Sequence, residues 1–185
     1  MLKIAIIAGS TRPGRKAETV AQWVLDYAKK RGDAEYELVD IAQFHLPVLD
    51  EAMPPSMGQY ANAHTKKWAE TIARYDGFVF VTPEYNHSIP GALKNAIDFI
   101  YKEWNNKAAG IVGYGGLGAG RAIEHLRGIL GELQIADVRT AVHLSMFTDF
   151  ENWSVFKPGP QHQDSLKTLF DQVVLWSGAL QKVRV

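Results

Sequence analysis

Residues 9–16 (GSTRPGRK) combine two hydroxyl side chains, two glycines and three basic side chains in one short segment. We expect a helix to begin directly after this segment. The free N–H groups and the dipole of a helix N-terminus favour an anion, and arginine adds a planar fork that matches phosphate oxygens. The segment therefore predicts a site for a phosphate group. The alternative is a helix-capping turn with solvated cations.

The same segment does not fit the phosphate loop of nucleoside triphosphate hydrolases. That pattern requires a lysine directly after Gly14 and then a serine or threonine, whereas the chain has Arg15 and Lys16. The sequence therefore argues against nucleoside triphosphate hydrolysis and favours a static anchor for a phosphomonoester.

Residues 82–98 (TPEYNHSIPGALKNAID) form a second segment with unusual chemistry. We expect a buried strand to run directly into Pro, Glu, Tyr, Asn and His, and Pro90 suits a helix start, where its missing N–H costs little. An aromatic ring and several amides beside a phosphate site suit a flat ring that is rich in heteroatoms. Alternatively, the Asn and Ser side chains only cap the following helix.

A third segment, residues 113–121 (GYGGLGAGR), contains the spacing G-x-G-x-x-G. In a dinucleotide-binding fold this spacing follows the first strand of a βαβ unit, and an acidic residue ends the next strand. Here the spacing follows the fourth expected strand, and the nearby Asp137 begins the next one. We therefore favour a different interpretation, in which the glycines let a ring approach the backbone closely.

The rest of the chain must bring these three segments together. Short β-rich runs alternate with longer runs of helical spacing, which predicts a mainly parallel sheet covered on both faces. The expected strands are 3–8, 36–40, 77–82, 109–114 and 137–144, and the expected helices are 16–30, 64–75, 91–103, 121–135 and 165–182.

We therefore predict an α/β protein with a three-layer doubly wound, flavodoxin-like fold, whose five-stranded parallel sheet has the order 2-1-3-4-5. Residues 1–185 are expected to form a single domain. In this strand order the ligand crevice lies at the carboxyl ends of strands 1 and 3, so the three segments share one rim of the sheet. The irregular stretches 43–59 and 145–163 are long for connections, and each is a cover, an interface loop or a mobile segment.

The composition excludes several classes of protein. Twenty basic residues balance twenty acidic ones, which removes the positive footprint of a general nucleic-acid binder. Cysteine is absent, which excludes disulfides, zinc–thiolate sites and thiol catalysis, and the six histidines show no metal-binding spacing. No apolar run approaches the ~20 residues of a membrane helix. We expect a cytoplasmic protein with no metal, membrane or nucleic acid as a partner.

Residues 9–12 (GSTR), 83–86 (PEYN) and 90–98 (PGALKNAID) resemble the motifs of the NADPH-dependent FMN reductase family. Its members are flavodoxin-like flavoproteins that include quinone, azo-dye and chromate reductases. The resemblance spans roughly residues 3–130. It implies that the chain binds FMN, which NADPH reduces and a small-molecule acceptor reoxidises.

The resemblance also implies which residues bind the cofactor. Ser10, Arg12 and the turn from Arg15 to Ala17 would hold the FMN phosphate. The residues expected around the ring and the ribityl chain are Pro83, Glu84, Tyr85, Asn86, Tyr114, Gly115 and Gly116. We predict no catalytic side chain, because the cofactor carries the hydride chemistry while the protein binds and orients it.

Two other functions remain open. One is a flavodoxin-type electron carrier, although such carriers are usually strongly acidic and this chain has no net charge. The other is a non-catalytic flavin-binding sensor. The resemblance further implies a homodimer or homotetramer, and we expect residues 99–104 and 147–156 to supply the contact surface. Glu84 is expected to make structural hydrogen bonds. Trp104 and Trp153 are expected to lie in the core or an interface, and the alternative is a wall that covers the flavin ring.

Overall fold

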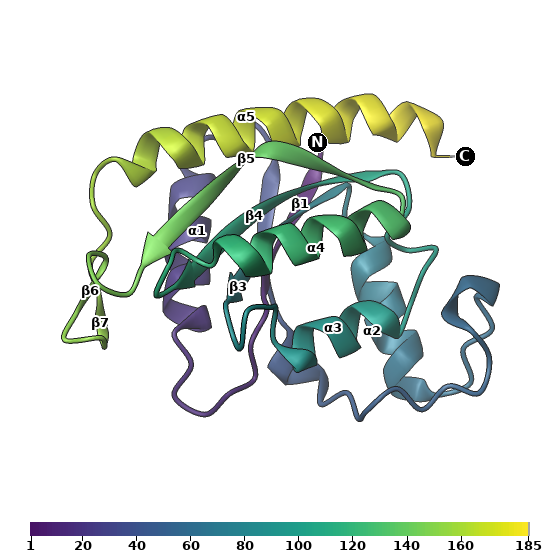
Figure 1. Cartoon of the computed structure of the whole chain (residues 1–185). Helices are drawn as coiled ribbons and strands as arrows, with labels where there is room; N and C mark the ends of the chain where they lie inside the picture. Colours follow the sequence, from purple (N-terminus) through teal and green to yellow (C-terminus); the bar gives the residue numbers. More distant parts are fainter. Residues whose placement is uncertain (185) are drawn as a thin grey trace.

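A parallel sheet forms the centre of the computed structural model, which describes residues 1–184 (Figure 1). Its strands are β1 (Lys3–Ala8), β2 (Glu35–Asp40), β3 (Gly77–Pro83), β4 (Lys107–Gly115) and β5 (Ile135–Ser145). They pair in the order β2-β1-β3-β4-β5, and every pair is parallel. The predicted flavodoxin-like strand order is confirmed.

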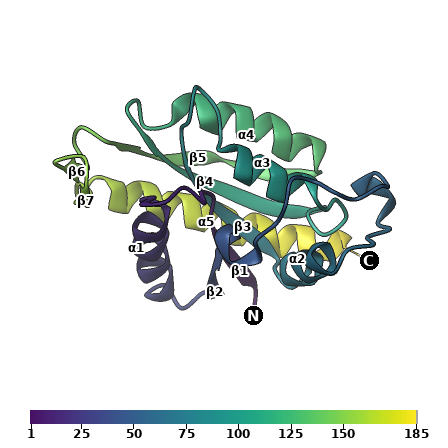
Figure 2. The ribbon, with the colours of Figure 1, turned by 90° about the horizontal axis from the view of Figure 1, so that it is seen from below.

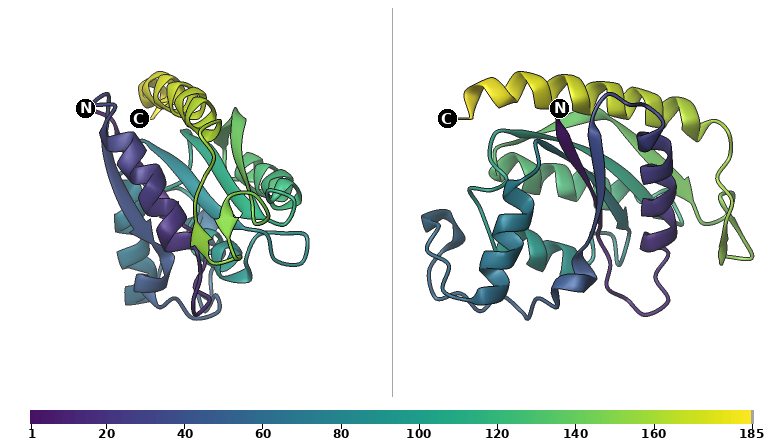
Figure 3. Two further views of the ribbon diagram at one scale, coloured as in Figure 1. Left: turned by 90° about the vertical axis from the view of Figure 1, so that its left-hand side faces the viewer. Right: turned by 180° about the vertical axis from the view of Figure 1, so that it is seen from behind.

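Helices cover both faces of this sheet (Figures 2 and 3). The helices are α1 (Ala17–Lys29), α2 (Ala63–Ala73), α3 (Gly91–Asp98), α4 (Gly120–Glu132) and α5 (His162–Leu180), and the 3-10 helices are η1 (Ile41–Phe44), η2 (Pro55–Met57) and η3 (Gln181–Val183). Residues of α1 and α5 pack in one apolar cluster, and residues of α2, α3 and α4 pack in the other. The three layers of the prediction are therefore present.

The sequences of the inner strands β3 and β4 explain why the sheet forms. Every residue of β3 and of β4 is buried, as their continuous apolar runs predict for strands covered on both faces. Large side chains such as Phe78 and Phe80 lie wholly in this core. Each such burial contributes about 1.5–3 kcal/mol to folding. The carboxyl ends of β1, β3 and β4 are thus fixed relative to one another.

The helix expected at 91–103 ends earlier, at Asp98, and the following aromatic residues turn into the core. Phe99 and Trp104 are completely buried. The Trp104 indole N–H donates to the carbonyl of Ile97 at 3.2 Å, and its ring packs edge to face against Phe78 at 5.0 Å. The rings of Phe99 and Trp104 are therefore not available to the contact surface expected at 99–104, since they fill the space between the sheet and α2.

The irregular stretch 43–59 is tied down by hydrogen bonds. The Asn95 side chain donates to the carbonyl of Pro47 at 2.7 Å and accepts from the N–H of Leu49 at 2.9 Å. The Glu51 carboxylate accepts from the N–H groups of Ala61 and Asn62. This stretch is therefore a fixed cover along α3 and the start of α2.

The second irregular stretch, 145–163, contains a small antiparallel hairpin. Its strands are β6 (Phe150–Glu151) and β7 (Val155–Phe156). Figure 1 shows this hairpin beyond the carboxyl end of β5, away from the sheet.

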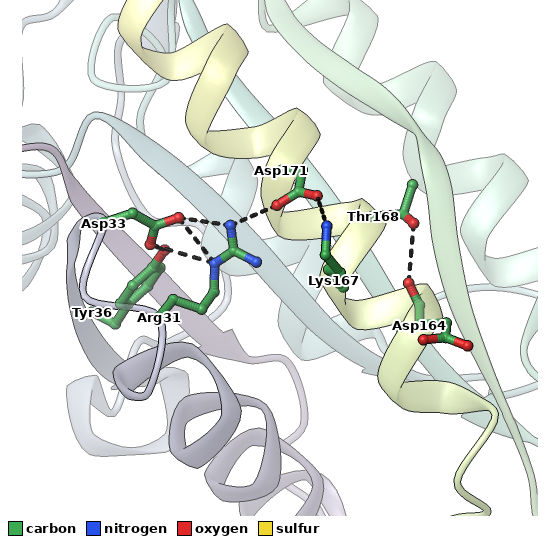
Figure 4. A network of polar contacts seen from close by, with 7 residues as sticks. All are labelled: Arg31, Asp33, Tyr36, Asp164, Lys167, Thr168 and Asp171. Atoms are coloured by element: carbon green, nitrogen blue, oxygen red, sulfur yellow. Dashed lines mark hydrogen bonds and ion pairs between the residues drawn. The ribbon is translucent and has the colours of Figure 1, made fainter.

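Polar contacts fasten the layers at the surface. Arg31, which follows α1, pairs with Asp33 at 2.6 Å and with Asp171 of α5 at 2.7 Å (Figure 4). At the amino end of β3, Asp76 accepts from the N–H of Lys3 at 2.9 Å and pairs with Arg184. The first strand and the last described turn therefore meet at Asp76. Among the described helices, none has both the length and the apolar character needed to cross a bilayer.

Candidate functional site

Three loops meet around one cavity at the carboxyl ends of β1, β3 and β4, as the strand order predicts. The cavity has a volume of about 380 Å³. Its lining consists of Arg12, Gly14, Arg15, Lys16, Pro83, Glu84, Tyr85, Tyr114, Gly115, Gly116, Met146 and Trp153. All the residues that the sequence assigned to cofactor binding are in this lining except Ser10, Ala17 and Asn86.

Ser10 lies just behind the cavity wall and joins two of the loops. Its side chain is completely buried, and its Oγ shares a hydrogen bond of 3.0 Å with the Tyr85 hydroxyl. The preceding Gly9 donates its N–H to Val81, and a Cβ on Gly9 would lie 2.9 Å from that carbonyl oxygen. Only glycine lets the backbone come this close to the Val81 carbonyl, so the first loop begins in contact with β3.

The two arginines of the first loop differ in their surroundings. The Arg15 guanidinium bonds the Asp40 carboxylate at 2.6 Å and also pairs with Glu18. Its Nε, however, is buried and has no hydrogen-bond partner among residues 1–184. Arg12 is exposed, forms no ion pair within the described chain and lies 6.0 Å from the centre of the Tyr85 ring. Arg12 therefore supplies an uncompensated positive charge at the cavity.

Helix α1 begins beside these arginines. No side chain of the described residues caps its N-terminus, which starts at Ala17. Its first N–H groups and its dipole therefore add to the attraction for an anion at this end of the cavity.

The second loop makes a tight turn at Asn86 and His87. Tyr85 and Ser88 exchange two backbone hydrogen bonds of 2.9 and 3.1 Å across it. Both central residues have a positive φ, 50° for Asn86 and 70° for His87, which is the left-handed conformation that such two-residue turns require. Asn86 is exposed at the tip of this turn, and the cavity lining does not include it.

Glu84 anchors the second loop to α4. Its carboxylate accepts from the N–H groups of Arg121 and Ala122, at 3.2 and 3.3 Å, and from the Arg121 side chain at 2.6 Å. Burial opposes ionisation of this group, but the hydrogen bonds outweigh burial and hold the pKa of Glu84 below its ordinary value. The expected structural role of Glu84 is thus confirmed. Its carboxylate also occupies the helix end where a dinucleotide-binding fold would place a pyrophosphate.

Tyr114 contributes a second unpartnered polar atom. The residue is 5% exposed, and its hydroxyl has no hydrogen-bond partner in residues 1–184. Burial raises the pKa of Tyr114 above its ordinary value, which keeps the phenol neutral and able to donate. Gly115 and Gly116 follow it, and their lack of side chains leaves the backbone open to the cavity.

Sequence analysis did not assign Gly14 or Met146 to the site, and it gave Trp153 a place beside the ring only as an alternative. Met146 and Trp153 come from the irregular stretch after β5, and Lys16 reaches across to it with a 3.3 Å hydrogen bond from Nζ to Ser154 Oγ. The sequence offered one signal for a hairpin with Trp153 in its turn, namely the two short strands at 150–151 and 155–156. Two-residue strands, however, are too short to show an alternating pattern. No group of side chains in residues 1–184 has the composition of a metal site.

Comparison with known proteins agrees with this geometry. A profile of the NADPH-dependent FMN reductase family matches residues 2–149. An NAD(P)H-dependent FMN reductase of Schizosaccharomyces pombe is 39% identical over 175 residues, which cover 92% of this chain and 88% of the relative. A 2-hydroxy-1,4-benzoquinone reductase of a Burkholderia species is 34% identical, over 72% of this chain and 73% of the relative.

Among solved structures, the flavoenzyme FerB from Paracoccus denitrificans, an NAD(P)H:acceptor oxidoreductase, superposes with a TM-score of 0.75 at 22% identity, over 97% of this chain and 98% of that one. This likeness agrees with the flavodoxin-like fold. The matched profile covers the three loops of the cavity, and the sequence identity to the S. pombe reductase extends over almost the whole chain. The chain therefore belongs to the NADPH-dependent FMN reductase family.

Proposed function

We propose that the cavity binds FMN and that the chain is an NAD(P)H-dependent oxidoreductase. The observation that carries this proposal is the pair of buried polar atoms, Arg15 Nε and Tyr114 OH, that have no partner within residues 1–184. Both are hydrogen-bond donors, and both residues line the cavity. A buried donor costs free energy unless it is satisfied, so the cavity fits a ligand that is rich in acceptor oxygens.

The residues divide into two groups along the cavity. Arg12, Arg15 and the N-terminus of α1 bind the phosphate, and Ser10 positions Tyr85 through their shared hydrogen bond. Pro83, Tyr85 and the backbone of Gly115 and Gly116 enclose the flavin ring. Glu84 fixes the loop of Pro83 and Tyr85 to α4. Asn86 holds the adjoining turn. When bound, FMN supplies the transfer of two electrons between a nicotinamide and an acceptor.

We propose a ping-pong reaction, in which the nicotinamide leaves before the acceptor enters. In the balanced reaction, NADPH, one proton and a quinone give NADP⁺ and a hydroquinone. The quinone class is supported by the benzoquinone reductase among the relatives. The chain's own residues orient the two rings and exclude water, so no side chain needs to act as a general acid or base. We also propose that the protein is cytoplasmic.

Anaerobic titration of the purified chain tests this function. We expect a yellow protein with one FMN for each chain, which NADPH bleaches and a quinone recolours. An electron carrier would be bleached only slowly by NADPH, and a flavin-binding sensor would keep its colour. A chain that binds no FMN would remove the proposal altogether.

We further propose that the chain forms a homodimer or homotetramer. The support is apolar surface, since Leu175 and Trp176 on α5 are 69% and 46% exposed. Of the two contact surfaces expected from the sequence, only 147–156 exposes large apolar side chains, namely Phe147, Trp153 and Val155. Sedimentation analysis of the purified chain measures the oligomeric state, and a stable, fully active monomer would contradict this proposal.

A further inference from the structure

The β6–β7 hairpin carries a tryptophan at a position where glycine is the usual residue. Its turn runs from Glu151 to Ser154 and is closed by a 3.1 Å hydrogen bond from the Ser154 N–H to the Glu151 carbonyl. The two central residues are left-handed, with φ of 50° at Asn152 and 59° at Trp153. Turns of this kind favour Asn followed by Gly, and a bulky residue with positive φ is an outlier. The backbone at Trp153 is therefore strained.

Burial of the side chain does not offset this strain. Trp153 is 59% exposed. Its main aromatic neighbour is Phe147, which lies edge to face with a centroid distance of 4.7 Å and is itself 64% exposed. Yet Trp153 lines the cavity together with Met146, Gly116 and Tyr85. Strained residues concentrate at functional sites, because the surrounding structure holds them in place for their function.

The base of the hairpin is rigid, which fixes where Trp153 is presented. Asp149, 1% exposed, accepts from the N–H groups of Ser145 and Gly159 at 2.8 and 3.1 Å, and it contacts His162 Nε2 at 2.8 Å. At the tip, Ser154 accepts from Lys16 of the first loop. The hairpin is therefore fastened on both sides of the cavity, and the indole needs little reorganisation to meet a ligand.

We propose that Trp153, supported by Phe147, is the aromatic wall of an acceptor subsite that takes planar conjugated rings of the quinone class. This inference rests on the proposed FMN-dependent function. A flat ring stacks on the indole, whereas a compact hydrophilic acceptor gains nothing from it. The quinone gains two electrons and two protons and leaves as the hydroquinone; the electrons and one proton come from NADPH and the second proton from solvent.

The decisive variant is Trp153→Gly, because glycine relieves the left-handed strain and keeps the turn. Trp153→Phe restores a flat ring. The control Val48→Ala removes an exposed apolar side chain that lies outside the cavity lining. Each FMN-loaded protein is photoreduced without oxygen and then mixed with menadione or with ferricyanide in a stopped-flow instrument. The rate of flavin reoxidation is measured for each acceptor.

We expect Trp153→Gly to lower the rate constant for menadione by about tenfold, the size of a lost ring stack, and to leave that for ferricyanide unchanged. Trp153→Phe should recover most of the menadione rate, and Val48→Ala should match the wild type. An unchanged menadione rate in Trp153→Gly would overturn the inference. So would an equal loss with both acceptors, which would place Trp153 at the flavin, or a smaller sedimenting mass, which would make it an interface residue. A wild-type chain without FMN would instead remove the proposed function first.

Discussion

Arg12 and Arg15 belong to the same loop, yet only one of them carries an uncompensated charge. The Arg15 guanidinium is held by Asp40 and Glu18, so it mainly shapes the loop, and its buried Nε has no partner among residues 1–184. Arg12 has no carboxylate partner among the described residues and lies next to Tyr85. The sequence could not separate these roles, because Asp40 approaches Arg15 only through the pairing of β1 with β2.

Replacing Arg12 with alanine should therefore weaken FMN binding. The lost bond is charge-assisted, so we expect a cost of about 1.5–3 kcal/mol in binding free energy. Fluorescence titration of the apoprotein with FMN measures it. Arg74→Ala is the matched control, since Arg74 is an exposed arginine whose side chain is 60% accessible and outside this cavity. Equal affinity of wild type and Arg12→Ala would refute the phosphate assignment.

At the level of secondary-structure elements, strands and loops were predicted better than helix ends and the hairpin. The runs AIIA and FVFV are continuously apolar, which predicts strands that are buried on both faces of the sheet. The early end of α3 was missed because Phe99, Ile100 and Trp104 continue a plausible apolar spacing, although their burial comes from packing against distant elements. The site was predicted at the loops that directly follow strands, where strand order alone brings residues together.

Helix α4 depends on a carboxylate from another loop at its N-terminus. Glu84→Gln keeps the shape of the side chain but removes the charge that Arg121 and two N–H groups stabilise. We expect the free energy of unfolding to fall by about 1–3 kcal/mol, measured by urea denaturation. Glu70→Gln, on the exposed side of α2, should change it little. A variant at position 84 as stable as the control would contradict the capping role.

Asp149 at the base of the hairpin should make the free energy of unfolding depend on pH in the acid range. Burial opposes ionisation of Asp149, but hydrogen bonds from Gly159, Ser145 and His162 outweigh it and hold its pKa below the ordinary 3.8. Stabilisation from a depressed carboxyl pKa is complete above the unfolded value and is lost as pH falls through the folded one. We therefore expect the free energy of unfolding to decrease below about pH 4 in the wild type, and less steeply in Asp149→Asn. Parallel curves for the two proteins would show that Asp149 contributes nothing to this loss.

At the scale of the whole molecule, ligand binding and folding are linked. The loops around the cavity are held by polar contacts such as that between Ser10 and Tyr85, whereas β3 and β4 beneath them are fully buried. A ligand that fills the cavity stabilises the folded chain by mass action, by about 2.7 kcal/mol at a concentration of one hundred times its Kd.

FMN should accordingly raise the melting temperature, and riboflavin, which has the ring without the phosphate, should raise it less at the same concentration. Differential scanning fluorimetry with both compounds checks this. The difference between the two shifts should become smaller in Arg12→Ala. Identical shifts in the wild type would mean that the first loop does not hold a phosphate.

The meeting of Lys3 and Arg184 at Asp76 lies at the amino end of β3, whereas the cavity lies at the carboxyl ends of the strands. A reporter or a surface tether attached near either residue would therefore leave the mouth of the cavity unobstructed. Molecules immobilised in this way on an electrode would present their reactive side to the solution.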